Sequence, residues 1–212
     1  MAELAPKFER LLEELLPRMG MGRNALQAYL DTRDETFWLR AEDAISRYEL
    51  LIARHEQSST DLIDGYLEVC DDMMKEQIKF ARTGKYSAAT SSDVTGEVYH
   101  SEEKMQAYMY GVAVSQFLWP QHYHLYDFFF RVLEGLKQQG KAPQRYLEVG
   151  PGHGLFLTSA MAIIPTAQFS AVDISPISIG LSTELVALTR PEINCNFVVK
   201  DVGDMPSAEA DF

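Results

Sequence analysis

The stretch Arg145-Tyr-Leu-Glu-Val-Gly-Pro-Gly-His-Gly154, continued by Leu155-Phe-Leu-Thr-Ser-Ala-Met-Ala-Ile-Ile164, decides the fold. A short apolar run ends in a cluster of glycines and a longer apolar run follows, which predicts a buried strand, a tight turn and a helix. Residues 167–175 and 195–202 predict two further strands, and residues 175–190 predict a helix that begins at Ser175 with Pro176 in its first turn. Because strands and helices alternate, we expect right-handed crossovers and a parallel sheet.

The chain before this unit has a different pattern. From Leu4 to about residue 139, apolar side chains recur at intervals of three and four, which predicts amphipathic helices. The fold class is therefore α/β, with an all-helical region over residues 1–140 and a strand-containing unit over residues 141–212. We expect five helices before the first strand, and we interpret residues 84–101, rich in Ser, Thr and Gly, as a surface loop or a lid.

Local signals set the expected bounds of these helices. Pro17, Gly20 and Gly22 end the first, and a capping box of Thr32 and Glu35 starts the second, which spans about 34–55. The third starts between Ser58 and Asp61 and stops at Gly84, the fourth runs from a Ser101 cap to Trp119, and the fifth covers 122–139. Two apolar faces are expected to be buried: Phe37, Ala41, Ile45, Tyr48 and Ile52 on the second helix, and Leu62, Tyr66, Val69, Met73 and Phe80 on the third.

The glycine turn carries the chemistry. Gly150, Gly152 and Gly154 allow a tight bend between strand and helix, and they let a ligand approach the main chain where a Cβ atom would collide. Asp173 follows at the end of the next strand, about 20 residues on, where a carboxylate can accept hydrogen bonds from ribose hydroxyls. The pattern therefore predicts a nucleoside cofactor bound over the turn.

The spacing of the glycines distinguishes two cofactors. The dinucleotide fingerprint G-x-G-x-x-G would need its third glycine where this chain has Leu155, which argues against a nicotinamide cofactor. The sequence E-x-G-x-G-x-G, with Glu148 as its acidic member, instead resembles the first motif of the class I S-adenosylmethionine-dependent methyltransferases. The resemblance covers residues 142–212, about a third of the chain.

The resemblance implies a role for each matching residue. Glu148 and Asp173 would anchor the cofactor S-adenosyl-L-methionine, with Asp173 on the ribose, and the three glycines would support it on the backbone. Ile174 would line the adenine, Asp201 would meet its amino group, and Val202 would pack on the ring. The implied activity is methyl transfer to an oxygen, nitrogen or carbon nucleophile of a small molecule, and the implied fold is the first βαβαβ half of a Rossmann-like methyltransferase domain.

The family's domain has seven strands, whereas this sequence reaches Phe212 where the fourth would begin. We therefore expect a truncated domain, in which the strand at 145–150 has an unpaired edge and one poorly covered face. The missing strands would come from a longer form of the chain, from a second copy in a homo-oligomer or from another polypeptide.

The helical region offers candidates for a catalytic base. His100, His122 and His124 qualify because a neutral imidazole can take a proton near pH 7, although aromatic residues around them are expected to pack in the core. Metal binding is not expected, because Glu97-x-x-His100 and His122-x-His124 lack the further ligands of a di-iron bundle. His153, within the glycine turn, is expected to face solvent or cofactor rather than to act as a base.

Composition limits the partners. The formal charge of −12, with 19 Lys and Arg against 31 Asp and Glu, disfavours nucleic acid, and no uncharged run is long enough for a membrane span. Two distant cysteines, Cys70 and Cys195, indicate neither disulfides nor a zinc site and fit a cytoplasmic protein. Two other functions stay open: a nicotinamide-dependent oxidoreductase, and a non-catalytic or truncated partner of a methyltransferase.

Overall fold

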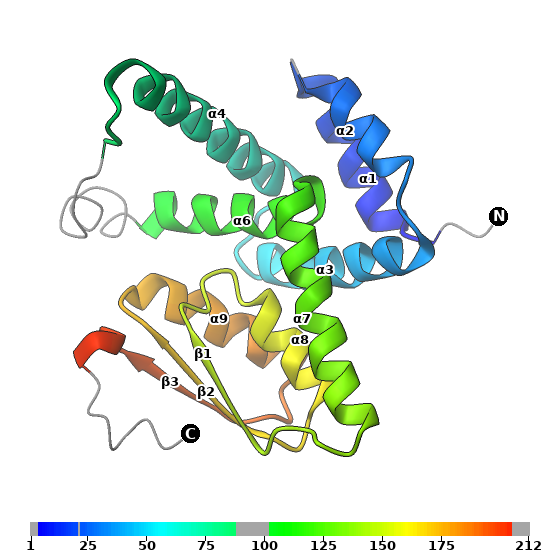
Figure 1. The fold of residues 1–212 in the computed structure, drawn as a ribbon, viewed down its shortest axis with the longest axis vertical. Helices are drawn as coiled ribbons and strands as arrows, with labels where there is room; N and C mark the ends of the chain where they lie inside the picture. Colours follow the sequence, from blue (N-terminus) through cyan, green and yellow to red (C-terminus); the bar gives the residue numbers. More distant parts are fainter. Residues whose placement is uncertain (1–3, 21, 88–101, 205–212) are drawn as a thin grey trace.

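The structure is a computed structural model that describes residues 4–20, 22–87 and 102–204. These residues form a mostly helical α/β fold with one small parallel sheet (Figure 1). The helices are α1 (Pro6–Leu15), α2 (Arg23–Leu30), α3 (Glu35–Arg54), α4 (Ser59–Thr83), α6 (Glu102–Leu118), α7 (Pro120–Gln138), α8 (Leu155–Ile163) and α9 (Pro176–Thr189). The strands are β1 (Arg145–Val149), β2 (Gln168–Asp173) and β3 (Cys195–Val199), and the short 3-10 turns are η1 (Leu16–Arg18) and η2 (Val202–Asp204).

Most helix ends follow their sequence signals. The Ser58 N–H donates to the Asp61 carboxylate at the start of α4, and α4 ends at Gly84 in the left-handed conformation, as predicted. Ser175 caps α9 by accepting the Ser178 N–H, also as predicted. The Ser101 cap and most of the predicted loop at 84–101 lie outside the described residues.

The start of α3 differs from the prediction. Asp34 caps this helix by accepting the Phe37 N–H at 2.9 Å, whereas the Thr32 hydroxyl donates to the carbonyl of Tyr29 in the preceding turn. The capping box of Thr32 and Glu35 is therefore wrong by two residues, because the chain still turns at Thr32 and becomes helical only after Asp34.

Two further differences concern packing. Helix α2 was not predicted, because its two turns bury only Leu26 and Leu30 and give no sustained period. On α4, Leu62, Tyr66 and Val69 are buried as expected, but Met73 and Phe80 from the same face are exposed, because the helix continues beyond its packing partners. No described helix combines the length and apolar character that a membrane span requires.

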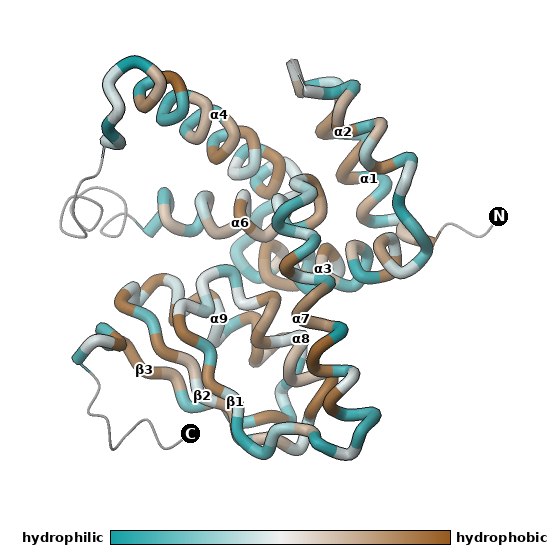
Figure 2. Tube along the Cα trace, viewed as in Figure 1, coloured by the Kyte–Doolittle hydropathy of each residue, from teal (hydrophilic) through white to brown (hydrophobic). Residues whose placement is uncertain are grey.

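The sheet has the order β1-β2-β3, and both pairs are parallel, as predicted. Among the described strands β1 pairs only with β2, so it forms an edge of this sheet. None of the five residues of β1 is fully buried, whereas β2 buries Phe169, Ala171 and Val172. Figure 2 shows β3 coloured mostly toward the hydrophobic end of its scale, whereas β1 and β2 mix hydrophobic and hydrophilic residues.

Helices α8 and α9 lie between the sheet and the N-terminal helices (Figure 1). On one side they pack against side chains of the strands, including Phe169 and Ala171. On the other side, Leu155 of α8 and Leu185 of α9 belong to the same buried cluster as Phe37 and Phe117 of the helical region. The predicted boundary at residue 140 falls between α7 and β1, but the core continues across it.

Candidate functional site

The glycine turn joins β1 to α8. Gly150, Gly152 and Gly154 have φ values of +71°, +47° and +71°, which place all three in the left-handed region that favours glycine. The Gly150 N–H donates to the Val172 carbonyl at 2.8 Å, so the turn begins where β1 and β2 end side by side. The predicted tight turn at the carboxyl ends of the strands is confirmed.

The three glycines differ in their surroundings. A Cβ atom on Gly154 would lie 3.1 Å from Cδ2 of Leu185 on α9, and one on Gly152 would lie 3.3 Å from the sulfur of Met109 on α6. A Cβ on Gly150 would have no neighbour within 4 Å. Two glycines therefore let α9 and α6 pack closely on the turn, while Gly150 leaves an open side.

Asp173 ends β2 at this turn. Its carboxylate accepts the Ser175 N–H at 2.8 Å. Burial raises the pKa of this carboxyl, and the backbone N–H groups of Ser175, Gly152 and Ile174 oppose that effect because they stabilise the charged form. The carboxylate therefore lies close to the centre of the turn.

Glu148 lies in β1, two residues before the turn. Its carboxylate accepts the Tyr146 hydroxyl at 2.8 Å and lies near the N–H of Leu157 in the first turn of α8, and burial raises its pKa to about 7. These contacts place Glu148 against the start of α8. Its predicted contact with a cofactor stays a prediction.

Exposed apolar residues gather at the same end of the sheet. Ile174 follows β2, and Val202 follows β3 in η2, and together with Val149 and Val199 they are between 45% and 55% exposed. Asp201 is also exposed, and its carboxylate accepts the Gly203 N–H at 2.8 Å. The structure therefore brings Asp173, Ile174, Asp201 and Val202 to adjacent strand ends, beside the open side of Gly150.

Of the two environments expected for His153, solvent is wrong, and contact with a cofactor stays a prediction. This residue is only 9% exposed, because its ring packs against Phe156 and its carbonyl accepts the Tyr48 hydroxyl at 2.6 Å. Its Nδ1 accepts the N–H of Leu155 at 3.2 Å, and burial, followed by the nearby His122, lowers its pKa to about 4. A neutral His153 therefore fixes the start of α8.

The candidate bases are not equivalent. His122 is half-buried; its Nδ1 lies 2.8 Å from the Ser115 hydroxyl, its ring contacts Trp119, and burial lowers its pKa. His124 is exposed on α7, and His100 lies outside the described residues, as does Glu97. Within the described part of the chain, no three His, Cys, Asp or Glu side chains are grouped to hold a metal ion.

Two hydroxyl groups that donate hydrogen bonds to the turn were not predicted from the sequence. The Ser182 hydroxyl of α9 donates to the Gly152 carbonyl at 3.2 Å, and the Tyr48 hydroxyl of α3 donates to the His153 carbonyl. Tyr48 was expected on the buried face of its helix, which is correct, but apolar periodicity gives no information about where a buried hydroxyl finds its acceptor.

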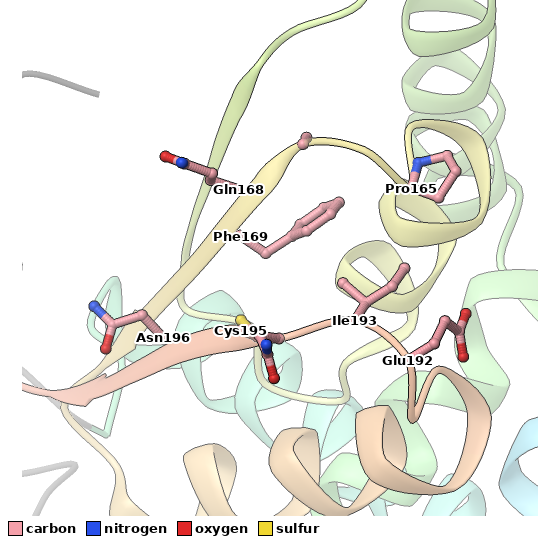
Figure 3. Close-up of a pocket in the computed structure, with 9 residues that line it drawn as sticks. Pro165, Gln168, Phe169, Glu192, Ile193, Cys195 and Asn196 are labelled. Atoms are coloured by element: carbon pink, nitrogen blue, oxygen red, sulfur yellow. The ribbon is translucent and has the colours of Figure 1, made fainter.

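A pocket of about 470 Å³ lies at the opposite end of β2 and β3 (Figure 3). Phe169, Ile193 and Cys195 contribute to its wall, and Glu192 lies at its edge. Because ligands of open α/β sheets bind at the carboxyl ends of the strands, this pocket is not part of the candidate site.

Comparisons with protein-family models, with curated proteins and with solved structures found no match to this chain.

Proposed function

We propose that this chain is a class I S-adenosylmethionine-dependent methyltransferase that acts on a small molecule. The observation that carries the proposal is the position of Asp173, whose carboxylate lies at the end of β2, close to the backbone N–H of Gly152 in the glycine turn. A carboxylate held beside a left-handed glycine turn is suited to bind the hydroxyls of a ribose lying across the turn.

The surrounding residues fit an adenosine group. Gly150 leaves space on the side of the turn where a Cβ atom would meet nothing, so a ligand can approach the main chain there. Ile174 and Val202 present exposed apolar surface on either side of the adjacent strand ends, which suits a flat aromatic ring, and Asp201 offers an acceptor for an amino group.

When bound, S-adenosylmethionine would supply a methyl group on a positively charged sulfur as the electrophile. The contribution of the chain is to bind and orient the cofactor through Asp173 and the glycine turn. Helix α6 reaches the turn through Met109, so the helical region can form a wall for the methyl acceptor. The net charge of −12 favours a small acceptor over a nucleic acid.

Calorimetric titration with S-adenosylhomocysteine tests the proposal. We expect saturable binding to the full chain, and at least tenfold weaker binding to Asp173→Asn, because the substitution removes the charge that strengthens hydrogen bonds to hydroxyls. Asp204→Asn provides the control, since Asp204 is an exposed carboxylate of η2 to which no cofactor contact is assigned. Circular dichroism of each variant checks that the fold is retained.

Parallel titration with NADH distinguishes the alternatives. Binding of NADH without binding of S-adenosylhomocysteine would support an oxidoreductase. Binding of neither compound to the folded chain would contradict the proposal and favour a non-catalytic partner.

A further inference from the structure

We infer that Tyr48 is a positioning residue through which the N-terminal helical region holds the glycine turn in its cofactor-binding conformation. The inference rests on the proposed function and adds to it a specific residue outside the motif, 105 positions before His153 in the chain. It predicts that cofactor affinity depends on α3, although α3 contributes no residue to the motif.

The hydrogen bond is buried at both ends. Tyr48 is 2% exposed, its ring packs edge-on against Tyr110 at 5.8 Å, and its hydroxyl donates to the His153 carbonyl at 2.6 Å. Burial raises the pKa of Tyr48 well above its ordinary value, so the hydroxyl keeps its proton and stays a donor at any physiological pH.

The turn needs such support because glycine does not determine its own conformation. His153 lies between Gly152 and Gly154, and glycine adopts positive and negative φ values almost equally well. The intrinsic backbone preference therefore opposes rotation of the peptide group between His153 and Gly154 only weakly, and hydrogen bonds must fix it. Its N–H donates to the Pro151 carbonyl at 2.7 Å within the turn, and its carbonyl accepts the Tyr48 hydroxyl from outside the turn. The Tyr48 donor opposes rotation because the rotated state would leave a buried hydroxyl without an acceptor.

Contacts of the preceding residue, Arg47, hold α3 and its Tyr48 hydroxyl in position against α8. Arg47 is 5% exposed, and its guanidinium donates to the hydroxyls of Thr158 at 2.9 Å and Ser159 at 3.1 Å on α8. Helix α3 is thus fixed to the helix that follows the turn. Gly152 is held from another element, because its carbonyl accepts the Ser182 hydroxyl of α9.

Tyr48→Phe tests the inference, with Tyr126→Phe as its matched control. Tyr126 is 1% exposed and its hydroxyl lies 2.9 Å from the Ser159 hydroxyl, so both variants lose one buried hydroxyl, but only Tyr48 bonds to the turn. In calorimetric titration of the full chain with S-adenosylhomocysteine, we expect about fivefold weaker binding for Tyr48→Phe, equivalent to about 1 kcal/mol, and a change of less than about twofold for Tyr126→Phe.

Amide hydrogen exchange of the chain without ligand gives a second readout. After correction for global stability, we expect faster exchange at Gly154 and Leu155 in Tyr48→Phe and not in Tyr126→Phe. Equal affinities and equal exchange in the two variants would overturn the inference while leaving the proposed function intact. If the wild-type chain does not bind S-adenosylhomocysteine, the proposed function fails, and unchanged exchange in Tyr48→Phe would then refute the positioning role separately.

Discussion

At the scale of single residues, Gly154 shows how one position serves both conformation and packing. Its φ of +71° disfavours any side chain, and the space that a Cβ would occupy is limited by Leu185 and Ser182 of α9. Glycine is therefore required here by the fold itself, whether or not a ligand binds.

We expect Gly154→Ala to lower the free energy of unfolding by about 1 to 3 kcal/mol, because a left-handed alanine costs about 1 to 2 kcal/mol before any displacement of α9. Gly180→Ala is the control: Gly180 lies within α9 with no atom within 4 Å of its Cβ position, so alanine there should stabilise by up to about 1 kcal/mol. Urea unfolding measures both. An unchanged free energy of unfolding in Gly154→Ala would contradict this prediction and show that the turn adjusts to a Cβ atom without cost.

Sequence alone could identify the residues of this turn whose role depends on the backbone. The glycine spacing and Asp173 were found because positive φ values and a strand end leave a pattern in the chain. The environment of His153 could not be predicted in the same way. It depends on Tyr48, Phe156 and His122, which fold over the turn from three different helices.

At the scale of elements, the predicted strands and long helices are confirmed, because apolar runs bounded by turn signals, or apolar residues at helical intervals, mark them in the sequence. The crossing of α4 and α6 was not foreseen. Cβ atoms on Gly65 and Gly111 would lie 2.3 Å from backbone oxygens of the opposite helix, so these glycines allow the two helices to touch. Within either helix they are ordinary glycines, and their role appears only when both helices are in place.

The contributions of Glu148, before the glycine turn, and His153, within it, to the free energy of unfolding depend on pH in opposite directions. The pKa of Glu148 rises from 4.5 to about 7 on folding, so between these values the folded chain keeps a proton that the unfolded chain has lost, and stability falls as pH rises. The pKa of His153 falls from 6.5 to about 4, so its contribution makes stability rise with pH across that window.

Glu148→Gln separates these effects, because it removes the pH-dependent contribution of Glu148 to stability and retains that of His153. Relative to wild type, we expect the variant to become progressively more stable as pH rises from 4.5 to 7, and the difference to be constant above that range. Urea unfolding at several pH values measures this, with Glu13→Gln, an exposed carboxyl of α1, as the control. A pH-independent difference between Glu148→Gln and wild type would show that Glu148 is ionised normally.

At the scale of the whole molecule, the sequence divides the chain at residue 140, whereas the buried core does not divide there. Leu155, Leu181 and Leu185 pack in one cluster with residues of the N-terminal helices, including Phe8 and Phe37. Sequence periodicity shows that α8 and α9 are apolar but not which layer covers them, because contacts between distant segments leave no local pattern. We infer that the two predicted regions unfold together.

Leu185→Ala tests this coupling because both tryptophans, Trp38 and Trp119, lie in the helical region, whereas Leu185 lies in α9 and is fully buried. If the core is shared, this substitution should lower the free energy of unfolding reported by tryptophan fluorescence by about 2 to 5 kcal/mol, the cost of a large cavity. Leu39→Ala is the control, at a half-exposed site of α3 in the same helical region. It should change this free energy of unfolding by less than about 0.5 kcal/mol. The opposite result would be an unchanged fluorescence transition in Leu185→Ala together with a circular dichroism transition that splits in two. It would mean that the sheet and the helical region are independent folding units.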